Sequence, residues 1–138
     1  MLVQSIMSAK VHTIKPDDTL QQVRQILSEV SYHHLLVQCD GKLVGLISDR
    51  DVLRNLSPFL GTEKESPQDK ELLHIRVETI MSSELVTVDR ETSVDCASIL
   101  LLENNISCLP VVNDESEIEG IITWKDILKF EVYGADED

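Results

Sequence analysis

The stretch Gly45-Leu46-Ile47-Ser48-Asp49-Arg50-Asp51 decides the fold, because it recurs as Gly120-Ile121-Ile122-Thr123-Trp124-Lys125-Asp126. Each copy is a glycine, two apolar residues, a hydroxyl residue, two variable positions and an aspartate, with two more apolar residues after it. Leucine and β-branched side chains suit a half-buried strand. A hydroxyl residue with an acid three positions later is the capping box of a helix N-terminus. Each copy therefore predicts a short strand that leads directly into a helix.

The two hydroxyl–aspartate pairs have two interpretations, and the residues leave both open. In the simpler one, Ser48 with Asp51 and Thr123 with Asp126 only close the helix starts. In the other they form part of a binding site. The unpaired N–H groups and the positive dipole end of a helix favour an anion, and an aspartate beside them can accept two hydrogen bonds from ribose hydroxyls. The presence of two copies argues against chance.

The repetition extends well beyond this stretch. Ser5-Ile6-Met7-Ser8 recurs as Thr79-Ile80-Met81-Ser82, and Val11-His12-Thr13-Ile14 as Leu85-Val86-Thr87-Val88. The offset is 74 residues in the first part of each repeat and becomes 75 after one inserted residue before Gly120. A period of this kind means that one supersecondary unit is built twice. We predict repeats at 1–60 and 78–138, joined by a linker at 61–77.

Each repeat is predicted to run strand, helix, strand, strand, helix, which is an α+β arrangement. The apolar periodicity places these elements near 11–14, 20–30, 34–38, 43–47 and 49–56 in the first repeat. In the second repeat they fall near 85–88, 94–104, 108–112, 118–122 and 124–133. Asp40-Gly41 predicts a tight hairpin turn, and one or two helical turns are expected within 69–77. The run Leu100-Leu101-Leu102 is expected to pack in the core.

Composition limits the function classes. The net charge is −13, of which residues 79–138 carry −11, so a phosphate backbone would be repelled and nucleic-acid binding is excluded. No apolar run approaches the ~20 residues of a membrane span, and no signal peptide is visible. Three widely spaced cysteines form neither a disulfide framework nor a metal motif, which indicates a reducing, cytoplasmic setting. The four histidines lack metal-ligand spacing, and no nucleophile motif is present, so an enzyme and a metal requirement are not expected.

Taken together, the doubled motifs resemble a tandem pair of CBS domains, often called a Bateman module. The resemblance rests on the two Ile-Met-Ser segments, the capped helices, Leu109-Pro110-Val111-Val112 and the two Gly-x-x-[Ser/Thr]-x-x-Asp stretches. It covers roughly 5–133. It implies two pseudo-twofold related βαββα repeats that pack through their sheets, with two clefts between them that bind adenine nucleotides or related adenosyl ligands. Leu36 departs from the pattern, because it stands where the second repeat has Pro110.

The resemblance also implies roles for individual residues. Asp51 and Asp126 would hold ribose hydroxyls, and Ser48 and Thr123 would meet phosphate. The base would lie near Ile6-Met7 and Ile80-Met81 of the opposite repeat. Arg50 and Lys125 are added as candidate cations, and Asp49 is a carboxylate that disfavours a polyanion in the first site.

The sequence therefore predicts a regulatory module that senses AMP, ADP, ATP or a related adenosyl ligand and uses no metal. We also expect a homodimer formed through the helices that follow the two motifs, acting on an unidentified target protein. The alternative is a structural dimerisation or interaction module whose clefts hold no ligand.

Overall fold

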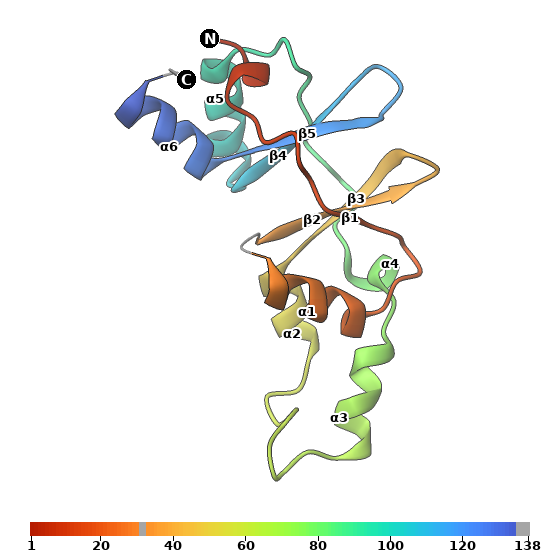
Figure 1. Ribbon diagram of the computed structural model, residues 1–138. Coiled ribbons are helices and arrows are strands. Elements are labelled where there is room, and N and C mark those ends of the chain that lie inside the picture. The colour runs from red at the N-terminus through yellow and green to blue at the C-terminus, as the bar shows by residue number, and fades with distance from the viewer. Residues whose placement is uncertain (31–32, 135–138) are drawn as a thin grey trace. The chain divides into compact units, whose positions relative to one another are not determined.

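A computed structural model describes residues 1–30 and 33–134 of the chain (Figure 1). The helices and strands follow one another in this order: η1 (Val3–Ser5), β1 (Thr13–Ile14), α1 (Leu20–Glu29), β2 (His34–Cys39), β3 (Lys42–Ser48), α2 (Asp49–Asn55), α3 (Pro67–Glu71), η2 (Leu72–His74), α4 (Val77–Ile80), α5 (Val94–Asn104), β4 (Cys108–Val112), β5 (Ile118–Thr123) and α6 (Trp124–Tyr133).

The chain folds into two compact units that exchange segments. Unit 1 combines residues 1–11 and 41–43 with 86–138, and unit 2 combines residues 12–40 with 44–85. Each unit therefore has the strands and helices of one repeat and takes the Ile-Met-Ser segment of the other. The exchange is visible in the two hydrophobic cores, because Val3 is fully buried in the core of unit 1 and Val77 in that of unit 2.

Unit 2 is built on a three-stranded sheet in the order β1-β2-β3. β1 runs parallel to β2, with Thr13 opposite Leu36 and Ile14 opposite Val37. The turn between β2 and β3 is the predicted one: Asp40 and Gly41 have φ angles of 54° and 81°, the left-handed geometry of a two-residue hairpin turn. α1 and α2 supply Leu20, Val23 and Val52 to the core.

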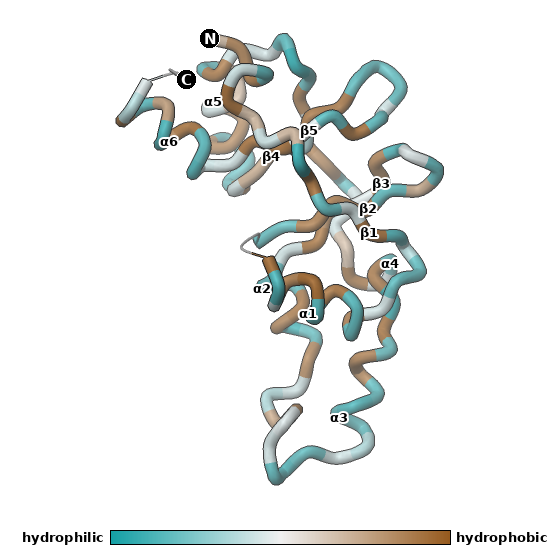
Figure 2. Tube along the Cα trace, in the orientation of Figure 1, coloured by the Kyte–Doolittle hydropathy of each residue, from teal (hydrophilic) through white to brown (hydrophobic). Residues whose placement is uncertain are grey.

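Unit 1 repeats this plan with a smaller sheet. β4 and β5 are antiparallel, with Cys108 opposite Thr123 and Val111 opposite Gly120. α5 and α6 contribute Val94, Ala97, Leu101 and Ile127 to the core. Figure 2 shows that apolar residues run along the strands of both units and alternate with polar residues on the helices.

The predicted strand at 85–88 is wrong, and a proline explains the difference. Of residues 85–88, only Val88 forms a β-bridge, and its partner is Val111. This pair corresponds to Ile14 and Val37 in unit 2. Val88 N–H donates to Pro110 O at 3.0 Å and Val88 O accepts from Val112 N–H at 2.9 Å. To extend the parallel ladder toward Val86, residue 110 would have to donate an N–H group, which proline lacks. Leu36, at the matching position of the first repeat, has no such restriction.

The helical turns expected within 69–77 are present, as the end of α3 and the whole of η2. Two smaller predictions need correction. The strand expected at 11–14 is only Thr13–Ile14. Leu102 is 66% exposed rather than in the core, whereas Leu101 is fully buried.

Candidate functional site

Both hydroxyl–aspartate pairs form complete capping boxes. In α2, Asp51 Oδ2 accepts from Ser48 N–H at 2.9 Å, and Asp51 N–H donates to Ser48 Oγ at 3.1 Å. In α6, Asp126 Oδ2 accepts from Thr123 N–H at 2.9 Å and also from the Thr123 hydroxyl at 3.1 Å, while Asp126 N–H donates to Thr123 Oγ1 at 3.3 Å. The local sequence alone accounts for these bonds.

The capping box leaves part of each carboxylate available. All the hydrogen bonds to the two side chains involve Oδ2, and Oδ1 of Asp51 and of Asp126 accepts none from the residues that the structure describes. A carboxylate has about four acceptor positions. The box therefore holds each carboxylate in a fixed orientation and leaves one oxygen able to accept from a ligand, so the two interpretations of the motif are compatible.

The N-terminal segment brings a second set of residues to α6. Ser8 and Ile121 exchange two backbone hydrogen bonds of 2.9 Å, which lays this segment beside β5. Gly120 permits the approach, because a Cβ there would lie 2.8 Å from Ser8 O and 2.9 Å from Met7 Sδ. Ile6 and Met7 consequently pack against the core of unit 1.

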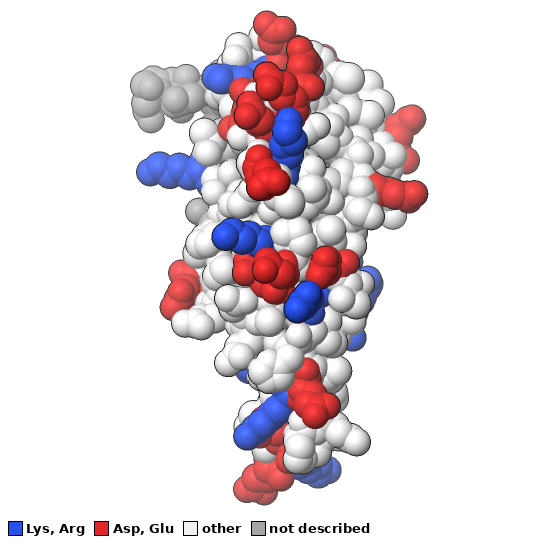
Figure 3. Space-filling model, turned by 90° about the vertical axis from the view of Figure 1, so that its right-hand side faces the viewer, with Lys and Arg blue, Asp and Glu red and all other residues white. Residues whose placement is uncertain are grey.

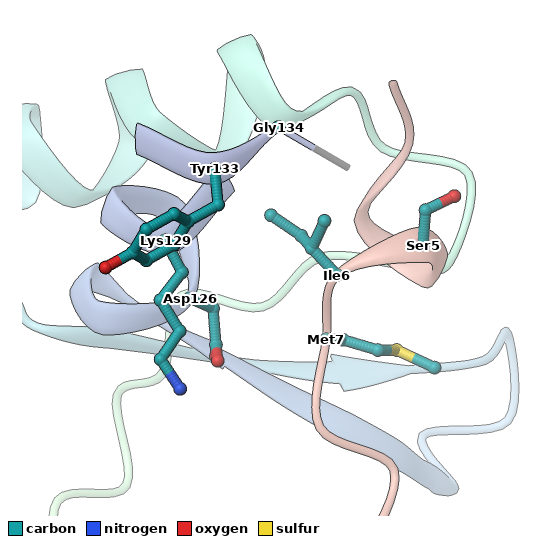
Figure 4. A pocket seen from close by; sticks show the side chains of 7 residues that line it. All are labelled: Ser5, Ile6, Met7, Asp126, Lys129, Tyr133 and Gly134. Carbon is teal, nitrogen blue, oxygen red and sulfur yellow. The ribbon is translucent and has the colours of Figure 1, made fainter. Parts of the chain in front are cut away.

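A pocket of about 220 Å³ lies between this segment and α6. Ser5, Ile6 and Met7 line one side, and the other side consists of Asp126, Lys129, Tyr133 and Gly134. Figure 4 shows Asp126, Lys129 and Tyr133 projecting from α6, with Ile6 facing them from the N-terminal segment. The pocket thus combines an apolar wall, an aromatic ring, one carboxylate and one ammonium group. Lys129 forms no ion pair with any residue in the described part of the chain.

Unit 2 has the matching backbone arrangement. Leu46 and Ser82 exchange backbone hydrogen bonds of 3.0 and 2.9 Å, as Ile121 and Ser8 do in unit 1. A Cβ on Gly45 would meet the Met81 side chain, with Cγ at 2.9 Å. Ile80 and Met81 pack against the core that contains Val52.

The two helix starts differ in the residue after the hydroxyl. In unit 2 this is Asp49, whose Oδ2 lies 2.9 Å from His33 Nδ1. The hydrogen bond with His33 lowers the pKa of the Asp49 carboxyl, so the extra negative charge beside α2 persists at neutral pH. In unit 1 the same position is Trp124, which is uncharged and whose Nε1–H donates to Ile106 O at 3.2 Å. The start of α6 therefore lacks the additional carboxylate that stands at the start of α2.

The structure brings together some of the predicted site residues and not others. Ile6, Met7 and Asp126 line one pocket, whereas Lys125 and Arg50 are exposed on the helices next to their aspartates. Thr123 and Ser48 are half-buried and act as caps. Lys129 and Tyr133 were not among the predicted residues. Their spacing from Asp126, three and seven positions along one helix, was the signal that places them on the same face.

A matched pair of titratable residues lies at the start of β2 and β4. Burial lowers the pKa of His34, an effect that the nearby Asp49 partly opposes. Cys108 occupies the corresponding position of the second repeat, and burial raises the pKa of its thiol to about 12. In both cases burial disfavours the charged form, so both side chains are neutral at pH 7.

The repetition of one plan in the two units agrees with comparison to known protein families. The CBS domain family matches residues 3–58 and again residues 77–133. The chain belongs to the CBS domain family. The fold is the α+β CBS-pair fold with two repeats, as the doubled motifs predicted.

Several CBS proteins match this chain along most of their own length. A CBS domain-containing protein of Dictyostelium discoideum is 36% identical over 130 residues, covering 93% of this chain and 89% of that protein. The solved CBS domain pair of protein MJ0100, in complex with 5′-methylthioadenosine and S-adenosyl-L-methionine, is 27% identical with a TM-score of 0.79, covering 96% of this chain and 97% of that one. CBSX2 in complex with AMP is 26% identical with a TM-score of 0.79, covering 96% of both chains.

Enzymes among the CBS relatives are matched only in part, over 22% to 24% of their length. Within residues 1–30 and 33–134, no helix is long and apolar enough to cross a membrane. The same residues contain no cluster of His, Cys, Asp and Glu suited to a metal ion.

Proposed function

We propose that this CBS pair is a regulatory module that binds an adenine nucleotide or a related adenosyl ligand, and that its principal site is the pocket beside α6. The observation that carries the proposal is the position of Asp126: its Oδ2 is held by the capping box, while its Oδ1 accepts no hydrogen bond from a described residue and the carboxylate lines the pocket. A ribose hydroxyl can donate to that oxygen.

The remaining lining residues fit the other parts of such a ligand. Ile6 and Met7 offer an apolar surface for a base, and the thioether of Met7 makes favourable contacts with aromatic rings. Lys129 is a cation without an ion-pair partner in the described structure, and it can meet a phosphate or a carboxylate. The complexes of MJ0100 and CBSX2 show that related CBS pairs hold 5′-methylthioadenosine, S-adenosyl-L-methionine and AMP.

Charge favours a ligand with few negative groups. Unit 1 has a net charge of −8, and Figure 3 shows a cluster of acidic side chains on the surface of the protein. One lysine in the pocket balances a monophosphate better than a triphosphate. We therefore expect AMP to bind more tightly than ATP.

A structural module without ligand is the second candidate. Its support is that both capping boxes are complete within the protein, so the two aspartates have a role in folding that needs no ligand.

The test is thermal unfolding in the presence of AMP, ADP, ATP and S-adenosylmethionine. A ligand at 100 times its dissociation constant adds about 2.7 kcal/mol to the free energy of unfolding, which raises the melting temperature by several degrees. We expect Asp126→Ala to abolish this shift and Asp51→Ala, the matched variant in α2, to retain most of it. Loss in Asp51→Ala alone would move the site to unit 2, and no shift with any ligand would favour the structural module.

A further inference from the structure

The helix that follows the motif is longer in the second repeat than in the first. α2 ends at Asn55, whereas α6 continues beyond the matching residue, Phe130, as far as Tyr133. In the first repeat Pro58 comes soon after the helix end, and proline cannot continue a helix. In the second repeat Gly134 ends α6 with a φ angle of 81°, and its N–H donates to Phe130 O at 2.8 Å. The repeated motif therefore does not require the additional turn, which belongs to unit 1 alone.

The additional turn contributes little to the core of unit 1. Tyr133 is 74% exposed and Val132 is 63% exposed, and neither is among the described residues that form or border that core. Phe130, one turn earlier, is the last side chain of α6 that packs against it. Burial therefore does not explain why α6 ends on an aromatic residue.

The additional turn places an aromatic ring at the pocket beside α6. Asp126, in the first turn of the helix, and Tyr133, its last residue, both line this pocket. Seven residues of helix span about 10 Å, and long helical side chains point back toward the N-terminus, so the ring lies closer to Asp126 than the backbone does. Figure 4 shows the Tyr133 ring beside Lys129, with Ile6 on the opposite wall of the pocket. A ligand whose ribose meets Asp126 can therefore extend its base along α6 to Tyr133.

We propose that Tyr133 selects the base of the ligand in this pocket: the base lies against the tyrosine ring, and Ile6 contacts it from the other wall. This inference rests on the ligand proposed above and adds the residue that sets the class of base. A stacking contact depends on the flat area of the base more than on its hydrogen-bonding groups. The pocket therefore holds a bicyclic purine more tightly than a monocyclic pyrimidine. Proline, at the matching position 58 of the first repeat, offers no aromatic ring.

The first test is the dissociation constant of AMP, measured by isothermal titration calorimetry. Tyr133→Ala should raise it at least about fivefold, the lower end of the effect of losing one stack between a base and an aromatic side chain. Tyr133→Phe keeps the ring and should remain within about threefold of the wild type. Val132→Ala removes an exposed side chain of the same turn that does not line the pocket, and it should remain within about twofold. Circular dichroism establishes that each variant is folded.

The second test separates selection of the base from a structural role of Tyr133. UMP has the same ribose and phosphate as AMP but a smaller base, and the wild type should bind it at least about fivefold more weakly than AMP. In Tyr133→Ala the two dissociation constants should lie within about twofold of each other, because the stacking surface is gone. A variant that only disturbed the end of α6 would weaken both nucleotides equally and keep their ratio.

The outcomes distinguish this inference from the proposed function. If the wild type binds AMP and Tyr133→Ala leaves both its affinity and the AMP to UMP ratio unchanged, the role of Tyr133 is wrong and the nucleotide site stands. An equal loss in Tyr133→Phe would also overturn the inference, because the ring would then not be the group that the base contacts. If the wild type does not bind AMP, the inference fails, and the thermal unfolding series with the other ligands shows whether the proposed function fails with it.

Discussion

Units 1 and 2 are built on the same hydrogen-bond pattern but present different surfaces. Both have a capping box at the start of the helix after the motif, and both receive an Ile-Met-Ser segment from the other repeat. They differ in the residue that follows the capping hydroxyl. In unit 2 this residue is Asp49, which pairs with His33, and in unit 1 it is Trp124, whose indole N–H donates to the Ile106 carbonyl. They differ again on the helix faces, which are polar on α1 and apolar on α5.

The comparison teaches that duplication preserved the backbone and its caps while the side chains around them diverged. The shared features are those on which the fold depends, because they satisfy the backbone donors at helix ends and allow the close approach of two segments. The divergent features are those that a ligand or a partner would contact. If the ligand proposed above binds chiefly in unit 1, these divergent side chains are the reason. The substitutions below test how far the two units are equivalent.

The largest expected difference concerns the two motif glycines. Gly120→Ala should lower the free energy of unfolding by about 1–3 kcal/mol, the usual cost of overpacking, because its Cβ would lie 2.8 Å from a backbone atom, Ser8 O. Gly45→Ala should cost less, since the contacts there are all with the flexible side chain of Met81. Urea denaturation of the two variants compares them directly. Equal losses would mean that the methionine of unit 2 is as rigid as the backbone of unit 1.

A smaller difference is expected between the two capping hydroxyls. Ser48→Ala and Thr123→Ala should each cost about 1 kcal/mol, the typical value for loss of an N-cap. Thr123→Ala should lower the free energy of unfolding more than Ser48→Ala does, because the Thr123 hydroxyl also donates to Asp126 Oδ2. Thr123→Ser keeps the hydroxyl and is the control. The same urea experiment measures these variants, and a cost for Ser48→Ala equal to or above that for Thr123→Ala would contradict the additional bond.

The smallest effect is a pH dependence that belongs to unit 2 alone. Burial lowers the pKa of His34 below its usual 6.5, so between the lowered value and 6.5 the unfolded chain binds more protons than the folded one. The free energy of unfolding should therefore fall as the pH decreases below about 6.5. His34→Cys copies Cys108 of the second repeat, whose thiol stays neutral over this range, and should reduce the slope. Identical slopes for the wild type and His34→Cys would show that His34 does not contribute.

Much of this fold was predictable because its signals are local. The capping boxes, the helix at 124–133 and the Asp40-Gly41 turn depend on residues a few positions apart, and the structure contains each of them. The prediction of a strand at 85–88 was wrong because the sequence pattern alone did not show that Pro110 lies opposite it and removes a donor from the ladder. The prediction that Leu102 packs in the core was wrong because a run of three leucines does not reveal which one faces outward.

The sequence by itself determined the duplication, the helix starts and the negative charge of the second half, since each follows from residue identity and spacing, and the resemblance of its doubled motifs implied the CBS-pair fold. Only the tertiary structure decided which residues meet across long stretches of chain. It added Lys129 and Tyr133 to the pocket that Ile6, Met7 and Asp126 line, and it left apolar side chains of α5 and α6 exposed. The physical reason is that segment exchange joins residues more than a hundred positions apart, and no local propensity encodes that pairing.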